Sequence, residues 1–255
     1  MTLDLATLPA LAFAFVLLLG RVGAALTLLP GLGEADSPAM LRAGFAIAIA
    51  LLLLPTVAPL VPAIPASIPT TAAMVAAEVV TGLWLGWLAR LLTLSLPMAG
   101  QFISFMLGTT NVLVTDTELG TQASALQQLF TLLAPLALLV SGLYALPLAA
   151  LAGSYTLIPP GALLPPADST QLATRAVADS FALALKLASP FVLAGVVWHV
   201  VIGLLARLVP RIPMYFVALP GQILGGLLLL AALGAIIIAA WQDAVGAGFA
   251  HLPGL

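Results

Sequence analysis

The sequence predicts an all-α integral membrane protein with about six hydrophobic segments, which include kinked and re-entrant helical hairpins. Hydrophobic residues make up 63% of its 255 residues and charged residues only 6%, and the mean hydropathy is +1.24, far above the range of soluble domains. No Asp, Glu, Lys or Arg occurs in 43–77, 119–167 or 212–242. Because a bilayer-crossing helix needs about 20 apolar residues, each of these runs is long enough for at least one span.

The first three segments are predicted at 8–29, 43–62 and 72–92. The first is expected to be a retained span and not a cleavable signal, because the residues before it include the acidic Asp4 and no basic residue. The links after it, PGLGEADSPAM and PTVAPLVPAIPASIP, are short and rich in Pro and Gly. Such residues kink or end helices, which a membrane tolerates only where neighbouring protein satisfies the freed backbone groups. We therefore expect a chain that packs against other subunits.

A polar segment, GQFISFMLGTTNVLVTDTELGTQASALQQ, follows at 100–128. Fourteen of its 29 residues are Ser, Thr, Asn, Gln, Asp or Glu, so it cannot face lipid, where each unsatisfied polar group costs several kcal/mol. It must lie in water, line a cavity or be buried against protein. Each of these settings indicates a membrane protein through which something passes or onto which something docks.

The last three segments are predicted at 129–153, 177–206 and 214–242. Four arginines lie at the ends of the predicted spans: Arg42, Arg90, Arg207 and Arg211. With six spans all four fall on one side of the membrane. The positive-inside rule makes that side cytoplasmic and places both termini on the opposite side.

Few ionisable residues lie inside the predicted spans, and among them are Arg21, Glu78, Lys186 and His199. Each is a candidate functional residue, because charge at the bilayer centre costs at least about 2.5–3.5 kcal/mol. Glu78 and Arg90 are about 18 Å apart along one helix, so each needs a partner elsewhere, and we expect interhelical contacts. Gly82 and Gly86 between them allow close helix packing. A lone histidine such as His199 is expected to be a hydrogen-bonded packing residue.

Motifs of known catalytic chemistry are absent from the sequence. It contains no HExxH, no GxSxG, no P-loop and no dinucleotide-binding glycine motif. With no cysteine and two histidines, it offers little material for a nucleophile–base pair or a metal site. We expect a protein that is not an enzyme and has no catalytic residues, no metal and no cofactor.

Short motifs in a fixed order carry a family resemblance over residues 12–245. They are RVGAALTLLPGLGEADSPAMLRAGFAIAIALLLLP, AAEVVTGLWLGWLARL, AGQFISFMLG, SYTLIPPG, LASP and IGLLARLVPRIPMYFVALPGQILGG. The positions that match the family spacing are Arg21, Pro30, Gly33, Pro38, Arg42, Pro55, Glu78, Gly82, Gly86, Gly100, Gln101, Gly108, Ser154, Pro159, Gly161, Ala188, Pro190, Gly203, Arg207, Pro210 and Pro220. On these motifs the chain resembles the FliR/SctT family of type III secretion export-apparatus proteins, and its flagellar members in particular.

The resemblance implies a subunit of the flagellar export gate in the bacterial inner membrane, within the flagellar basal body. Its implied partners are FliP-like and FliQ-like subunits, FlhB-like and FlhA-like export proteins, membrane lipid, and unfolded polypeptides in transit, but no nucleic acid. The implied fold is one export-gate domain with a FliP-like part over about 1–165 and a FliQ-like hairpin over about 170–255. Arg21, Arg42, Glu78, Arg90 and Arg207 would make subunit contacts, and Gly82, Gly86, Gly203 and Pro220 would serve helix packing.

Together with this resemblance, the polar segment predicts a pore plug, a loop at 102–121 that projects into a central channel. Its bulky residues would seal against ions, and its glycines would let the backbone leave the helical conformation. The candidate plug residues are Gly100, Gln101, Phe102, Phe105, Met106, Gly108, Asn111, Asp116 and Glu118. The alternative is an ordinary structured loop packed against FliP-like neighbours.

Three other functions are compatible with the sequence. A secondary transporter of a small solute would use discontinuous helices with a polar midsection, but it predicts two related halves, and no second polar segment follows residue 175. An injectisome homologue of the SctT type would share the same fold. A structural membrane subunit of some other complex is the third alternative.

Overall fold

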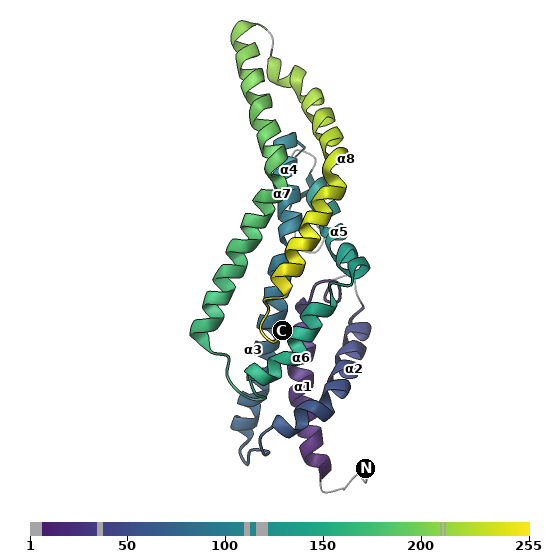
Figure 1. Ribbon diagram of the computed structural model, residues 1–255, viewed down its shortest axis with the longest axis vertical. Coiled ribbons are helices and arrows are strands. Elements are labelled where there is room, and N and C mark those ends of the chain that lie inside the picture. The colour runs from purple at the N-terminus through teal and green to yellow at the C-terminus, as the bar shows by residue number, and fades with distance from the viewer. Residues whose placement is uncertain (1–6, 35–37, 110–112, 116–121, 210, 212) are drawn as a thin grey trace. The chain divides into compact units, whose positions relative to one another are not determined.

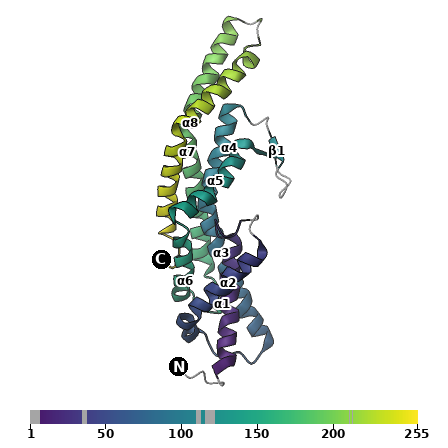
Figure 2. The same ribbon diagram turned by 90° about the vertical axis from the view of Figure 1, so that its right-hand side faces the viewer.

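Long helices account for most of the chain in the computed structural model, which describes residues 7–34, 38–109, 113–115, 122–209, 211 and 213–255 (Figures 1 and 2). In chain order the helices are α1 (Leu8–Leu28), α2 (Ala39–Val57), the short 3₁₀ helix η2 (Ala58–Leu60), α3 (Ile68–Thr93), α4 (Ser95–Leu107), α5 (Ala125–Ser141), α6 (Ala145–Leu157), α7 (Pro166–Leu208) and α8 (Met214–Phe249). Two three-residue strands, β1 (Leu113–Thr115) and β2 (Gln122–Ser124), pair antiparallel with Leu113 opposite Ser124.

Five of these helical stretches are long and apolar enough to cross a membrane, and a sixth arises if one bent helix pair counts as a span. The bent pair is α5 with α6, which meet at 74°. The break contains Gly142 at φ 75°, a left-handed conformation that residues with a Cβ adopt at a cost. An all-α membrane protein with about six hydrophobic segments and a bent helix pair is thus confirmed.

Two predicted boundaries were wrong. The sixth segment does not end at 242, because α8 continues through Asp243 to Phe249, whereas the predicted end of the third segment at 92 agrees with α3, which ends at Thr93. The fifth segment begins at Pro166 and not at 177. Proline fits the first turn of a helix, where its missing N–H group has no helical partner to lose. In both cases the helix includes polar residues that lie beyond the apolar run.

The chain divides into two compact units. The first consists of Met1–Leu92, Leu138–Val177 and Gly246–Leu255. Inside it α1 buries one face, formed by positions three and four apart: Ala14, Leu17, Leu18, Arg21, Val22, Ala25 and Leu26. Leu18 packs with Ala50, Val57 and Tyr155, so residues from α1, α2 and α6 share this core.

The last ten residues complete the first unit. Phe249 and Leu252 are buried, and Gly254 adopts φ 105°. A Cβ atom on Gly153 of α6 would overlap the carbonyl oxygen of Gly254. This close approach needs glycine at both positions, so the C-terminal turn is fitted to α6.

The second unit consists of Thr93–Ala137 and Ala178–Val245. Trp241 of α8 is fully buried in it, and its indole Nε1 donates to Ser95 Oγ of α4 at 3.0 Å. Gln242 Nε2 donates to the carbonyl oxygen of Ala137 at 3.1 Å. These two hydrogen bonds satisfy polar groups in an apolar setting, where an unpaired donor would be costly.

Candidate functional site

A buried ion pair lies at the centre of the first unit, between α1 and α3. Arg21 Nε lies 2.8 Å from Glu78 Oε2, and Arg21 Nη2 donates to Glu78 Oε1 at 3.0 Å. Both side chains are fully shielded from solvent. The two parallel hydrogen bonds form the bidentate geometry in which a guanidinium binds a carboxylate most strongly.

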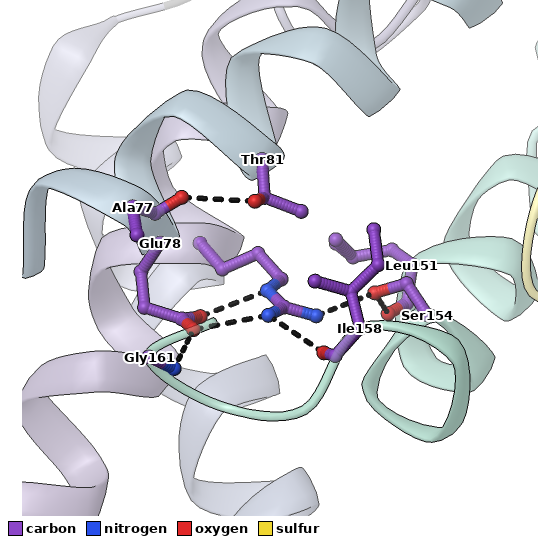
Figure 3. Close-up of polar contacts among 8 residues, drawn as sticks. Ala77, Glu78, Thr81, Leu151, Ser154, Ile158 and Gly161 are labelled. Atoms are coloured by element: carbon purple, nitrogen blue, oxygen red, sulfur yellow. Dashed lines mark hydrogen bonds and ion pairs between the residues drawn. The ribbon is translucent and has the colours of Figure 1, made fainter. Parts of the chain in front are cut away.

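Residues of α6 and of the turn after it complete this network (Figure 3). Arg21 donates through Nη1 to Ser154 Oγ at 3.1 Å and through Nη2 to the carbonyl oxygen of Ile158 at 3.0 Å. The Gly161 N–H group donates to Glu78 Oε1 at 2.6 Å. The guanidinium carbon of Arg21 lies 4.2 Å from the ring centre of Tyr155, a cation–π contact. We call these six residues the Arg21 network: Arg21, Glu78, Ser154, Tyr155, Ile158 and Gly161.

Gly82 and Gly86 let α3 approach the backbone of α1 beside the network. A Cβ atom on Gly82 would overlap the carbonyl oxygen of Arg21, and one on Gly86 would lie 2.6 Å from that of Ala25. Within the described chain Gly203 has no atom within 4 Å of its Cβ position, and Pro220 is exposed within α8. Of these four positions, Gly82 and Gly86 are the two that take part in close helix packing among the described residues.

Sequence reasoning singled out Arg21 and Glu78 but did not pair them. It found Ser154 and Gly161 only as positions of the family resemblance, and it missed Tyr155. The signal was present, because Arg21 and Glu78 are opposite charges inside two predicted spans, and each needed a partner. The Arg21 network therefore contains four positions of the family resemblance: Arg21, Glu78, Ser154 and Gly161.

The other predicted charges lie at the periphery. Arg90 Nη2 lies 3.7 Å from Glu34 Oε2, and both side chains are about one-third exposed. Arg42 is half-buried and Arg207 is exposed. Each of Glu78 and Arg90 thus has a partner on another part of the chain, as expected, although only Glu78 lies in the core.

The predicted plug loop is helical over its first residues, which corrects its boundary. Gly100, Gln101, Phe102, Phe105 and Met106 all belong to α4, and Gly108 caps that helix at φ 72°. The helix continues because Ile103 and Leu107, four residues apart, are buried on one face. Gly100 was expected to bend the backbone. Instead, a Cβ atom on Gly100 would lie 2.7 Å from the ring of Phe130. Glycine at this position therefore allows close packing.

The candidate plug residues differ in how firmly they are held. Phe105 is 66% exposed, whereas Met106 packs against α7, with its sulfur 3.0 Å from the Cβ position of Gly195. Gln222 Nε2 of α8 donates to the carbonyl oxygen of Met106 at 2.7 Å. Gln101 is half-buried, and its Oε1 has no hydrogen-bond partner among the described residues. Asn111, Asp116 and Glu118 lie outside the described residues.

His199 of α7 is hydrogen-bonded, as the sequence indicated, but its side chain is exposed and not packed in a core. His199 Nδ1 lies 2.6 Å from the carbonyl oxygen of Gly195, one turn earlier in the same helix. Within the described ranges no three His, Asp or Glu side chains gather in a way that could hold a metal ion. The described arrangement therefore offers buried ion pairing and apolar surface as its main physical features.

Comparison with known proteins adds direct relatives. The sequence matches the family model described as bacterial export proteins, family 1, over residues 12–248. It is 32% identical over 231 residues to the flagellar biosynthetic protein FliR of Caulobacter vibrioides, covering 91% of this chain and 92% of that protein. It is 26% identical over 216 residues to the flagellar biosynthetic protein FliR of Bacillus subtilis, covering 82% of each.

Proposed function

The chain belongs to the bacterial export proteins of family 1, and on that premise we propose that it is a subunit of the flagellar type III protein export gate. In this role it is a non-catalytic, multi-pass protein of the bacterial inner membrane, in the flagellar basal body. It forms a pore complex with FliP-like and FliQ-like subunits, next to FlhB-like and FlhA-like proteins. Unfolded flagellar polypeptides pass through that pore.

The observation that carries the proposal is the extent of the family match. The matched region covers residues 12–248, and both flagellar relatives align over more than four-fifths of this chain. The resemblance is therefore not confined to one motif that another membrane protein could share.

The exposed apolar surface supports a role among other subunits. In the most apolar 18-residue stretch of each helix, few residues are buried: 17% of them in α2 with η2, 11% in α7 and 6% in α8. Lipid or neighbouring protein must cover such surfaces. The pairing of α7 with α8 as consecutive long helices supports the proposal that about 170–255 is a FliQ-like hairpin after a FliP-like part.

The polar segment is proposed to close the pore as a plug beyond the end of α4. Support comes from its position after a helix that is anchored to α7 and α8 through Met106. Replacing residues 110–121 by a short Gly-Ser linker is expected to leave assembly intact and to raise ion conductance through the membrane. The same replacement at 61–67 is the control. Unchanged conductance in the 110–121 variant would contradict the plug.

The experiment that tests the whole proposal is co-purification. A tagged chain is expressed with the neighbouring membrane genes, extracted in mild detergent and weighed by native mass spectrometry. We expect one discrete assembly that contains this chain with FliP-like and FliQ-like subunits. A monomer or homodimer without them would overturn the export-gate proposal and favour the solute transporter.

A further inference from the structure

Four charged side chains follow one line along the first part of α7. They are separated by seven, four and seven residues and alternate in sign: Asp168, Arg175, Asp179 and Lys186. In an α-helix these intervals return to the same side within about 20°, and the interior proline of α7, Pro190, comes after all four. We call these residues the α7 charge stripe, which is about 27 Å long.

The α7 charge stripe lies on an exposed face of the helix. All four side chains are exposed, and none of them forms an ion pair with another described residue. The buried residues of the same stretch lie on a different face: Ser169, Ser180, Ala184, Leu187, Ala188 and Phe191. Two negative and two positive charges are therefore presented outward without a partner in the described part of the chain.

Neither water alone nor lipid alone suits the surroundings of the stripe. Phe181 and Leu185, beside it on the same helix, are each 50% exposed. Beyond Lys186 the same intervals of seven, four and seven residues lead to three exposed apolar side chains: Leu193, Val197 and Leu204. Large exposed apolar residues next to aligned charges are typical of a surface that another protein covers.

The order of the charges argues against a second copy of this chain as the partner. In a closed dimer of copies inserted in one orientation, the two α7 helices run in the same direction and in the same register. Like charges would then meet at all four positions of the stripe and repel. An antiparallel pair would match every charge, but its two copies would have opposite orientations in the membrane.

We propose that the α7 charge stripe docks one helix of a different subunit of the export complex, and that this helix carries the four opposite charges at the same intervals. Two carboxylates of the partner helix face Arg175 and Lys186, and two of its cations face Asp168 and Asp179. The inference rests on the proposed function, because it requires membership of such a complex, and it adds the chemistry of the partner.

The stripe selects the partner and its register more than it adds affinity. A matching helix that shifts by seven residues in either direction brings two of its charges against like charges of the stripe. Such repulsion in shifted registers is how charged positions fix the alignment of paired helices. The apolar side chains beside and beyond the stripe supply the buried surface of the contact.

The test exchanges the two central charges in Arg175→Asp with Asp179→Arg. This double exchange keeps the net charge of α7, and it places the acidic residue before the basic one, which favours a helix. The tagged full-length chain is expressed with the neighbouring membrane genes and purified in mild detergent. Recovery of the matching subunit is expected to fall about tenfold or more, because like charges meet at both positions.

The matched control is Arg175→Gln with Asp179→Asn, which removes the same attractions without adding repulsion. It is expected to reduce recovery less than the double exchange does. Unchanged elution and thermal unfolding of each variant chain, purified alone in detergent, would show that it is folded.

A photoreactive benzoylphenylalanine in place of Ala182 identifies the partner. Ala182 is exposed and lies between Asp179 and Lys186 along the stripe. In the assembled complex we expect one adduct, located by mass spectrometry in a helix of another subunit whose charges match the stripe. Reversing the two matching charges of that helix is then expected to restore recovery with the double exchange.

Three results would overturn the docking site. Wild-type recovery with the double exchange would show that the stripe is only solvated. An adduct with a second copy of this chain, with lipid or with a helix that lacks matching charges would assign this face to another occupant. If the wild-type chain recovers no other subunit, the export-gate proposal fails and the docking site fails with it, whereas equal assembly of wild type and double exchange removes the docking site alone.

Discussion

At the scale of single residues, Arg21 and Glu78 depend on each other. Burying two charges is expensive, and a bidentate pair with further hydrogen bonds roughly offsets that cost. The intact pair is therefore expected to add little to the free energy of unfolding. Removing one member, by contrast, leaves a bare charge in the core.

We expect Glu78→Gln to destabilise the protein by about 3–5 kcal/mol, because it leaves the Arg21 charge without its counter-ion. The matched control is Glu34→Gln in the half-exposed pair with Arg90, which is expected to cost about 0–1 kcal/mol. The measurement is the thermal unfolding midpoint of the purified full-length chain in detergent.

A double variant separates charge from packing in the same experiment. Arg21→Met combined with Glu78→Gln removes both charges and keeps an amide oxygen for the Gly161 N–H group. It is expected to be more stable than Glu78→Gln alone. Equal or lower stability of the double variant would mean that the ion pair is not what the single variant disrupts.

Gly82 gives a second residue-scale prediction. Gly82→Ala is expected to cost about 1–3 kcal/mol by overpacking, because the new methyl group overlaps the Arg21 carbonyl oxygen. Gly203→Ala is the control, with nothing nearby in the described chain, and should be neutral or stabilising by up to about 1 kcal/mol. If Gly203→Ala lowers recovery of the assembled complex instead, Gly203 packs against another subunit.

At the scale of elements, the bend between α5 and α6 depends on a single backbone conformation. Gly142 has a positive φ and no atom within 4 Å of its Cβ position, so a substitution there meets strain without a steric clash. We expect Gly142→Ala to cost about 1–2 kcal/mol and Gly142→Asn to cost less, because Asn tolerates the left-handed region. Equal losses in unfolding experiments on the two variants would contradict this account.

The helices were predictable from hydropathy, whereas some of their ends were not. Apolar runs predicted both ends of α1, the end of α3 and the beginning of α8 to within one residue, because length and apolar content decide a span. The end of α4 was missed since Gly100, Gln101 and Ser104 suggested a loop, although Ile103 and Leu107 carry a helical spacing. The Arg21 network was only half predictable, because no local pattern links residues 57 positions apart.

At the scale of the whole molecule, the topology can be tested directly, because the sequence contains no cysteine. Leu163→Cys lies before α7 and Leu208→Cys at its end, and the native side chains are 81% and 76% exposed. The positive-inside rule places Leu208, beside Arg207 and Arg211, in the cytoplasm.

We expect a membrane-impermeant maleimide to label Leu163→Cys in intact spheroplasts and Leu208→Cys only after the membrane is opened. The unmodified chain supplies a background without thiols. Labelling of both positions from the same side would mean that α7 does not cross the membrane.

The C-terminal turn on α6 has a consequence for biosynthesis. The first unit contains residues 246–255, which leave the ribosome only after all of the second unit has been made. The surface that residues 246–255 cover in the first unit therefore stays uncovered until α7 and α8 have been synthesised. A chain stalled before residue 246 would leave that surface exposed to the quality-control proteases of the cell. Packing of Phe249, Leu252 and Gly254 is therefore the last step in the folding of the first unit.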